Sequence, residues 1–423
     1  MSASKLIGII LSLFVLALAL RLGAGVALKM DAPLSEDEPE YFNAARSIAQ
    51  GRGYQLVPQQ STDAVPRPTA YRVPGTALIL AGVFTVTHDS IFVARAVSIV
   101  MASLAAPLMF LFARRFVPTP AAIIAGAACA LYPTFIFVSR QILSEPYFVP
   151  LFLLALLLTA IAYESKNLRS WLLAGLMWGA CAMVRPHAAP MAFLIAVYVF
   201  LRLGWRPALV MGCGVMMLII PWVIRNQIVF HKTIFFANES GETLLGSNNR
   251  YVLDDPSLHG MWIPPMRVPE YVVALMPIRG EVERNKEQSR IAMDYLKANP
   301  QQIPRLAVYK LMRWLTPVTV SGGKGRLLVL GSYGVLLLLL AMGLRFGIYG
   351  GTFPFHMTLL CTSVLFLITL VFWGNLTRGR LPLEVLWMPW GAWSAWTLAR
   401  RVMRWNRTAL PVRQGDNMAA TTR

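Results

Sequence analysis

Apolar stretches about as long as a membrane-spanning helix recur along this chain, and polar segments of very unequal length connect them. An α-helix needs about 20 apolar residues to cross a hydrocarbon core about 30 Å thick, so each stretch predicts one span. Two polar connections, residues 29–90 and 226–325, are far longer than the others. The pattern predicts ten spans, at residues 5–28, 91–113, 119–138, 144–163, 170–184, 187–203, 207–225, 326–346, 354–373 and 382–399.

One further apolar stretch, residues 75–87, has only about 13 residues, a length typical of an interfacial or re-entrant helix. If it does not span, most Lys and Arg residues of the short loops and the C-terminal tail share one side, as the positive-inside rule requires. If it does span, this bias is inverted. We therefore expect a multi-pass protein of the plasma (inner) membrane with both termini cytoplasmic and both long loops on the outer face. Residues 1–399 then form the membrane domain, and residues 400–423 form a basic cytoplasmic tail.

Composition supports a membrane protein, because 56% of the 423 residues are hydrophobic and only 14% are charged. The formal net charge of +19 does not indicate a nucleic-acid partner, since the positive residues are scattered over short loops and the tail. Membrane lipids are the expected surroundings. All four cysteines fall inside predicted spans without a CxxC spacing, which is typical of buried thiols and not of metal ligands or disulfides.

The first long loop begins with an unusual group of acids: Glu36, Asp37, Glu38 and Glu40 lie within five residues. Pro39 predicts that a helix starts here, since a proline is tolerated only in the first turn. Asp37 is then a suitable N-cap, with Glu40 completing a capping box. A cap needs one carboxylate, however, and this segment has four. Acids held at a membrane surface can also accept a proton from a hydroxyl or bind a divalent cation.

Other polar residues stand where predicted spans meet the outer face. Glu145 opens one span, Arg185 follows another, and Arg225 ends a third. Helix capping explains the acid and snorkelling explains the arginines when each is considered alone. An ionisable residue at the membrane boundary is nevertheless a functional candidate. The predicted topology places all of them on one face, together with Arg378 and Arg380, which precede the last span.

The second long loop contains a turn-rich polar segment and two predicted amphipathic helices. Residues 241–249 include Asn248 and Asn249 and are polar enough to face a sugar. Residues 281–297 and 301–315 alternate apolar and charged positions with a helical period, and Asn299-Pro300 separates them. The second of these helices is expected to lie along the bilayer.

Two other classes of function fit part of this pattern. A transporter or flippase for a lipid-linked sugar would suit ten spans, but its ionisable groups should lie near the midplane of broken helices. A non-catalytic protein that binds a lipid carrier would keep the arginines and would not depend on Asp37. The sequence has no P-loop, HExxH, GxSxG or Rossmann glycine pattern, so it gives no support to nucleotide or hydrolase chemistry.

The order of the short motifs resembles that of the C-type (GT-C) membrane glycosyltransferases. It is most similar to the glycosyltransferase family 39-like group, which comprises the dolichyl-phosphate-mannose protein mannosyltransferases and the lipid A aminoarabinose transferase. The motifs are Asp37-Glu38-x-x-Tyr41, Arg72-x-Pro74-Gly75, Leu143-Ser144-Glu145-Pro146, Arg185-Pro186, Pro221-Trp222-x-x-Arg225-Asn226, Gly246-x-Asn248-Asn249 and Arg378-x-Arg380-Leu381-Pro382-Leu383. Arg72-Val73-Pro74-Gly75 replaces the double proline of many relatives, and the expected absence of a long soluble C-terminal domain leaves the acceptor open.

The resemblance implies a GT-C-like all-α bundle of about ten to eleven transmembrane helices with juxtamembrane helices in the first outer loop. It implies an enzyme that transfers a sugar from a polyprenyl-phosphate donor to a hydroxyl of a protein, lipid or glycan, usually with inversion. By position, Asp37 would be the base and Glu38 a helper, and Glu145 would be the acid of the second outer loop. The donor phosphate would be bound by Arg72, Arg225, Arg378 and Arg380, with Tyr41, Arg185, Asn248 and Asn249 as further site candidates.

These residue types suit that chemistry. Phosphate is already a good leaving group, so the protein must stabilise its charge and deprotonate the incoming hydroxyl. Arginine forks do the first, and a positioned carboxylate does the second, with a contribution of about 10²–10⁴-fold. Asp37 and Glu145 could also share a divalent metal cation that offsets their mutual repulsion and holds the phosphate.

Overall fold

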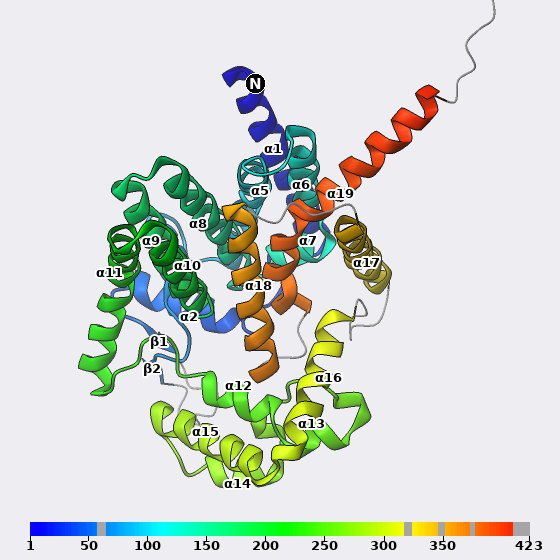
Figure 1. The fold of residues 1–423 in the computed structure, drawn as a ribbon. Helices are drawn as coiled ribbons and strands as arrows, with labels where there is room; N and C mark the ends of the chain where they lie inside the picture. The colour runs from blue at the N-terminus through cyan, green and yellow to red at the C-terminus, as the bar shows by residue number, and fades with distance from the viewer. Residues whose placement is uncertain (57–64, 317–323, 346–351, 373–376, 409–423) are drawn as a thin grey trace, which may run out of the picture.

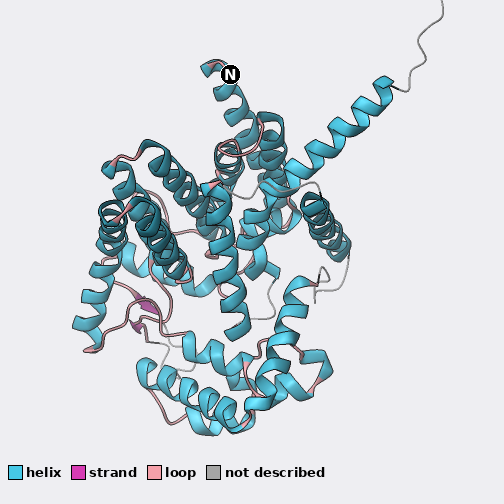
Figure 2. Cartoon of the chain, viewed as in Figure 1, coloured by secondary structure: helices cyan, strands magenta, loops and turns pink. Residues whose placement is uncertain are grey.

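A computed structural model describes residues 1–56, 65–316, 324–345, 352–372 and 377–408. Over these described ranges the chain is mostly helical, with one two-stranded antiparallel ribbon (Figure 2). The predicted all-α class is therefore confirmed. The predicted cytoplasmic tail lies largely outside the described residues.

Five described helices are long and apolar enough to cross a bilayer, or six if one bent pair is counted as a single span. The bend, 49° between α6 and α7, occurs at Pro133, which cannot donate a backbone hydrogen bond within a continuing helix. These elements are α1 (Ala3–Ala27), α4 with α5 (Ile91–Ser103 and Ala105–Ala113), α8 (Glu145–Ser165), α11 (Trp205–Phe230), α18 (Phe353–Val371), and the pair α6 (Thr119–Leu131) and α7 (Pro133–Ser139).

The remaining predicted spans also form helices, which are α9 (Leu168–Val184), α10 (Ala188–Leu203), α17 (Lys324–Arg345) and α19 (Leu381–Thr408). Their apolar portions are shorter or are interrupted by charge, so the predicted count of ten spans is not confirmed. The structure does show a multi-pass bundle of apolar helices. Its main buried core is rich in alanine and phenylalanine and runs from α1 to α19.

The first long loop packs against this bundle as two short helices and the ribbon. They are α2 (Glu38–Ala49), β1 (Gln55–Leu56), β2 (Arg67–Pro68) and α3 (Gly75–Phe84). Pro39 lies in the first turn of α2 as predicted, and the short apolar helix predicted at 75–87 is α3. Gly75 allows α3 to approach the end of α9, because a Cβ there would lie 2.5 Å from the Met183 carbonyl oxygen.

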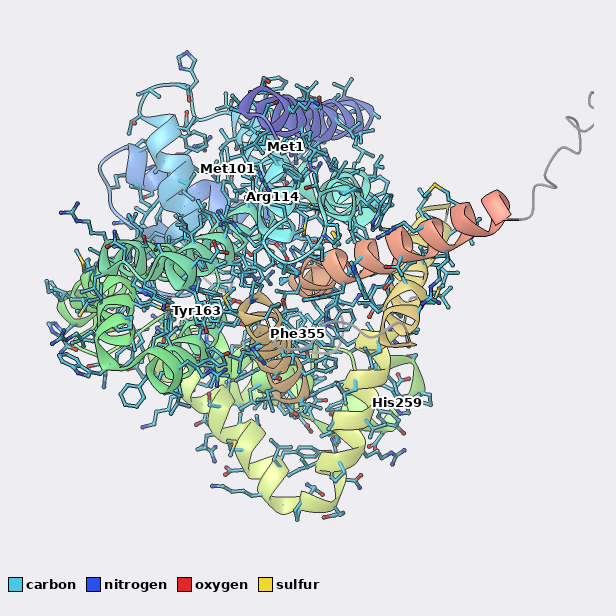
Figure 3. All side chains as sticks on the ribbon, turned by 45° about the horizontal axis from the view of Figure 1, so that its top comes forward. Met1, Met101, Arg114, Tyr163, His259 and Phe355 are labelled. Atoms are coloured by element: carbon cyan, nitrogen blue, oxygen red, sulfur yellow. The ribbon has the colours of Figure 1, made fainter. Side chains whose placement is uncertain are left out.

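The second long loop forms a separate layer at the opposite end from the N-terminus, with its own small core around Leu245 and Leu275 (Figure 1). The two predicted amphipathic helices are present as α15 and α16, and α16 packs against α18. Figure 3 shows His259 in this layer, well away from Met1. The elements are α12 (Ser240–Ser247), α13 (Arg250–Asp254), η1 (Pro256–Leu258), η2 (Pro265–Arg267), α14 (Pro269–Leu275), α15 (Glu281–Ala298), η3 (Pro300–Gln302) and α16 (Ile303–Leu315).

Candidate active site

Asp37 lies at the N-cap position of α2, but its side chain makes no capping hydrogen bond. The predicted capping box with Glu40 therefore does not form. Instead, Arg378 donates from Nη2 to Asp37 Oδ2 at 2.6 Å, and Arg72 Nη2 lies 3.3 Å from Oδ1. Arg378 belongs to the short turn η4 (Thr377–Arg380), which directly precedes α19. Burial acts to raise the pKa of Asp37, but the charges of Arg72 and Arg378 outweigh it and hold the pKa below the usual range.

Glu145 joins the same group of charges from the start of α8. Its Oε1 lies 3.4 Å from Arg185 Nη1 and 3.9 Å from Arg378 Nε, and its side chain is buried. Arg378 therefore lies between the acid of the first outer loop and the acid of the next one. We call Asp37, Glu145, Arg72, Arg185 and Arg378 the Asp37 cluster.

Arg72 pairs with two further carboxylates besides that of Asp37. Its Nε contacts Glu40 and its Nη1 contacts Glu239, both at 2.6 Å, and its guanidinium lies 5.7 Å from the centre of the Tyr41 ring. Glu239 comes from the second long loop and belongs to none of the motifs that indicated a site, so sequence reasoning missed it. Burial raises the pKa of Glu239 despite the nearby Arg72. The two long loops thus contribute charges to one site.

Glu38 has different surroundings from Asp37, although the two residues are adjacent. It is fully buried, with Oε2 3.1 Å from Arg95 Nη2. The backbone N–H groups of Ser35 and Ile142 also donate to it, each at 3.0 Å. Arg95 in turn donates to the carbonyl oxygens of residues 30, 32 and 33, so this ion pair fixes the turn that presents Asp37. A lone arginine inside the apolar span 91–113 was the signal that could have identified Arg95.

Arg225 and Arg380, two predicted phosphate ligands, bond mainly to the protein itself. Arg225 donates to the carbonyl oxygens of Thr69 and Tyr54, at 2.7 and 2.9 Å, and so holds the loop that carries Arg72. Arg380 is buried and lies 2.5 Å from Glu384 Oε1. Neither Arg225 nor Arg380 has a contact with Asp37 or Glu145 among the described ion pairs.

Asn248 and Asn249, the predicted sugar-facing pair, also have partners within the protein. Asn248 donates to the carbonyl oxygens of Leu244 and Val371, and Asn249 accepts from the backbone N–H of Val252 as the cap of α13. Asn248 Oδ1 also accepts from Lys310 at 2.7 Å. These contacts connect the second long loop to the end of α18.

The donor set offers limited support for the metal ion predicted between Asp37 and Glu145. The guanidinium of Arg378 already contacts both carboxylates. Within the part of the chain that the structure describes, no three His, Cys, Asp or Glu side chains gather as a metal site. The divalent cation stays a prediction from the sequence.

Residues 67–224 match the family model for dolichyl-phosphate-mannose-protein mannosyltransferase. This match confirms the resemblance to the GT-C membrane glycosyltransferases that the order of motifs indicated. No curated protein sequence matches the chain.

Among solved structures, the fold is similar to the oligosaccharyltransferase of Archaeoglobus fulgidus in its apo form. The TM-score is 0.58 at 12% identity, over 96% of this chain and 52% of that one. The complex of the same archaeal protein with an inhibitory peptide and a dolichol-phosphate gives a TM-score of 0.55 at 13% identity, with the same coverage. The chain thus spans about half the length of this oligosaccharyltransferase, and at these identities the likeness concerns the fold. ArnT from Cupriavidus metallidurans bound to undecaprenyl phosphate gives 0.42 at 13% identity, over 97% and 81% of the two chains.

Proposed function

We propose that this chain is a membrane glycosyltransferase that moves a sugar from a polyprenyl-phosphate donor to a hydroxyl acceptor, with Asp37 as the general base. The acceptor oxygen attacks the anomeric carbon, and the bond from that carbon to the phosphate oxygen breaks. The electron pair leaves with the polyprenyl phosphate, and Asp37 takes the hydroxyl proton. A single displacement of this kind inverts the configuration of the sugar.

The observation that carries the proposal is the contact of Asp37 with two arginines from distant parts of the chain. A base and two anion-binding forks within hydrogen-bonding distance are what this displacement requires. Arg72 and Arg378 would bind the phosphate, and Arg185 would hold Glu145 beside it. The rivals have less support, because a transporter needs its charges near the midplane of the spans and a scaffold needs no base.

The ion pairs also suggest how the base is activated. In the structure, Arg72 and Arg378 hold the pKa of Asp37 below its usual range. A donor phosphate that binds the same guanidinium groups draws part of their charge away from Asp37. The carboxylate then becomes more basic only when the donor is present, so that proton transfer is coupled to donor binding.

The donor's lipid chain would lie in the bilayer beside the short helix α3, with the sugar at the surface of the membrane. The Asp37 cluster would face the outside, and both termini would be cytoplasmic, because that orientation satisfies the positive-inside rule. The acceptor is a protein, a lipid or a glycan.

The decisive test compares Asp37→Asn with Asp31→Asn, an exposed acid of the same loop, in the purified full chain. Radiolabelled polyprenyl-phosphate sugars are supplied with membrane fractions as acceptors. We expect Asp37→Asn to lose about 10²–10⁴-fold in transfer rate while it still binds the donor, since only proton removal is impaired. Asp31→Asn should behave as the wild type.

Other results would point to other functions. Unchanged transfer by Asp37→Asn would remove Asp37 as the base. Donor binding without any transfer by the wild type, across all acceptors, would favour the scaffold. Movement of the labelled lipid across a vesicle membrane by the wild type, again without transfer, would favour the flippase.

A further inference from the structure

Helix α16 contacts the C-terminal end of α18, which precedes the turn of Arg378 in the sequence. Lys310, near the middle of α16, is fully buried. Its Nζ donates to the carbonyl oxygens of Leu370 and Val371, at 3.1 and 3.0 Å, as well as to Asn248. These two carbonyl groups belong to the last turn of α18, where helix carbonyl groups have no partner within the helix. A cation there also interacts favourably with the helix dipole.

The same helix touches the chain just after Arg378. Arg380 Nη1 donates to the carbonyl oxygens of Trp314 and Thr316, at 2.8 and 3.0 Å, at the C-terminal end of α16. Glu384 accepts from Arg380 Nε at 2.5 Å, and the ring centre of Tyr333 lies 3.6 Å from the guanidinium carbon. Arg380 is therefore held on several sides, two residues from Arg378 in the same short turn.

We propose that α16 is a clamp that positions Arg378, with Lys310 and Arg380 as its two points of attachment. Neither residue touches Asp37 or Glu145, so each acts through Arg378 and is a positioning residue. The functional importance of the clamp rests on the proposed function, in which Arg378 binds the donor phosphate. The contacts that form the clamp do not depend on that function.

Two features favour a positioning role over simple packing. First, the attachments lie on both sides of Arg378 in the sequence and converge on one short helix. Second, burial lowers the pKa of the Lys310 amine to about 7, and its three acceptors are uncharged oxygens. A buried amine without an acidic partner contributes less to stability than a carbon side chain of similar length would, which suggests a role for its directed hydrogen bonds.

A first test measures the coupling between Asp37 and Arg378 without any need for catalysis. The change in Tm is determined for Asp37→Asn, for Arg378→Gln and for the double variant, in the purified full chain. The departure from additivity reports their contact. The set is repeated in the Lys310→Met background and, as a matched control, in the Arg305→Met background, because Arg305 is an exposed cation of the same helix.

We expect the coupling to fall by half or more with Lys310→Met and to persist with Arg305→Met. Equal coupling in both backgrounds would overturn the clamp. If Lys310→Met does not fold, Lys310→Gln takes its place, since its shorter, uncharged amide has two donors for three acceptors and must loosen the attachment, and the same comparison with Arg305→Met decides. Arg380→Lys, which keeps the charge but loses the two-pronged contact with α16, should lower the coupling in the same way.

A second test uses transfer. Lys310→Met should raise the donor KM by about tenfold in the wild-type background and should add nothing to Arg378→Gln, because both changes act on the same contact. Additive effects would contradict the clamp. If the wild type transfers no sugar, the proposed function fails, whereas the Tm measurements still test the clamp.

Discussion

Arg378 and Asp37 are 341 positions apart in the chain, yet Nη2 of the arginine lies 2.6 Å from Oδ2 of the aspartate. The arginine belongs to the turn before the last helix, and the aspartate belongs to the turn before the first helix of the outer loop. Because Arg378 also approaches Glu145, this one side chain connects three distant segments of the chain.

Replacing Arg378 should weaken donor binding more than it slows sugar transfer from the bound donor. Arg378→Gln removes a permanent charge that would face the phosphate, so we expect the donor KM to rise by about 10- to 100-fold, the range for one lost charge-assisted contact. Arg378→Lys should recover part of this loss, since it restores the charge without the fork. Steady-state transfer at varied donor concentration provides the measurement. A change confined to kcat would contradict the role in phosphate binding.

Glu38→Gln should destabilise the protein. It leaves Arg95 buried without a counter-charge, and breaking a buried ion pair in this way costs about 3–5 kcal/mol. We expect a clearly lower Tm in detergent, whereas Glu36→Gln, whose side chain is 61% exposed, should change the Tm little. An unchanged Tm together with lost transfer would instead support the sequence-based prediction that Glu38 assists the base.

Lys310 should make stability depend on pH in the neutral to alkaline range. The folded protein binds this proton less tightly than the unfolded chain, because burial lowers the pKa from 10.5 to about 7. The loss of folding stability that comes from burying the charged amine is therefore complete below about pH 7, and it diminishes as the pH rises toward 10.5. The Tm of the wild type should rise relative to that of Lys310→Met between pH 7 and about 9. Arg305→Met keeps Lys310 and should follow the wild type, and parallel curves for wild type and Lys310→Met would contradict this.

Removal of divalent cations should leave transfer intact. Arg72, Arg185 and Arg378 already supply positive charge around Asp37 and Glu145, so the phosphate has cationic partners without a metal ion. Transfer is measured after treatment with EDTA, with the untreated protein and an EDTA-treated sample given Mg²⁺ or Mn²⁺ as controls. A loss that either ion restores would establish the shared divalent cation expected from the sequence.

The sequence by itself determined the membrane class, the helices and the places where they start. Those features follow from local causes, namely the length of apolar stretches and the restrictions that Pro39 and Pro146 impose on a first turn. It also identified all five members of the Asp37 cluster, because charged residues at the ends of spans are conspicuous in an apolar chain and because the resemblance to a known family pointed to Arg72.

Only the tertiary structure decided which of these charges meet. Asp37 and Glu38 are neighbours with the same local signal, but Arg378 and Arg72 reach one while Arg95 reaches the other. Arg378 and Arg380 differ in the same way, since one contacts the cluster and the other is bonded to α16. These differences arise from the packing of segments that lie from 35 to 341 positions apart in the chain, and no spacing along the chain encodes which guanidinium group a carboxylate will find.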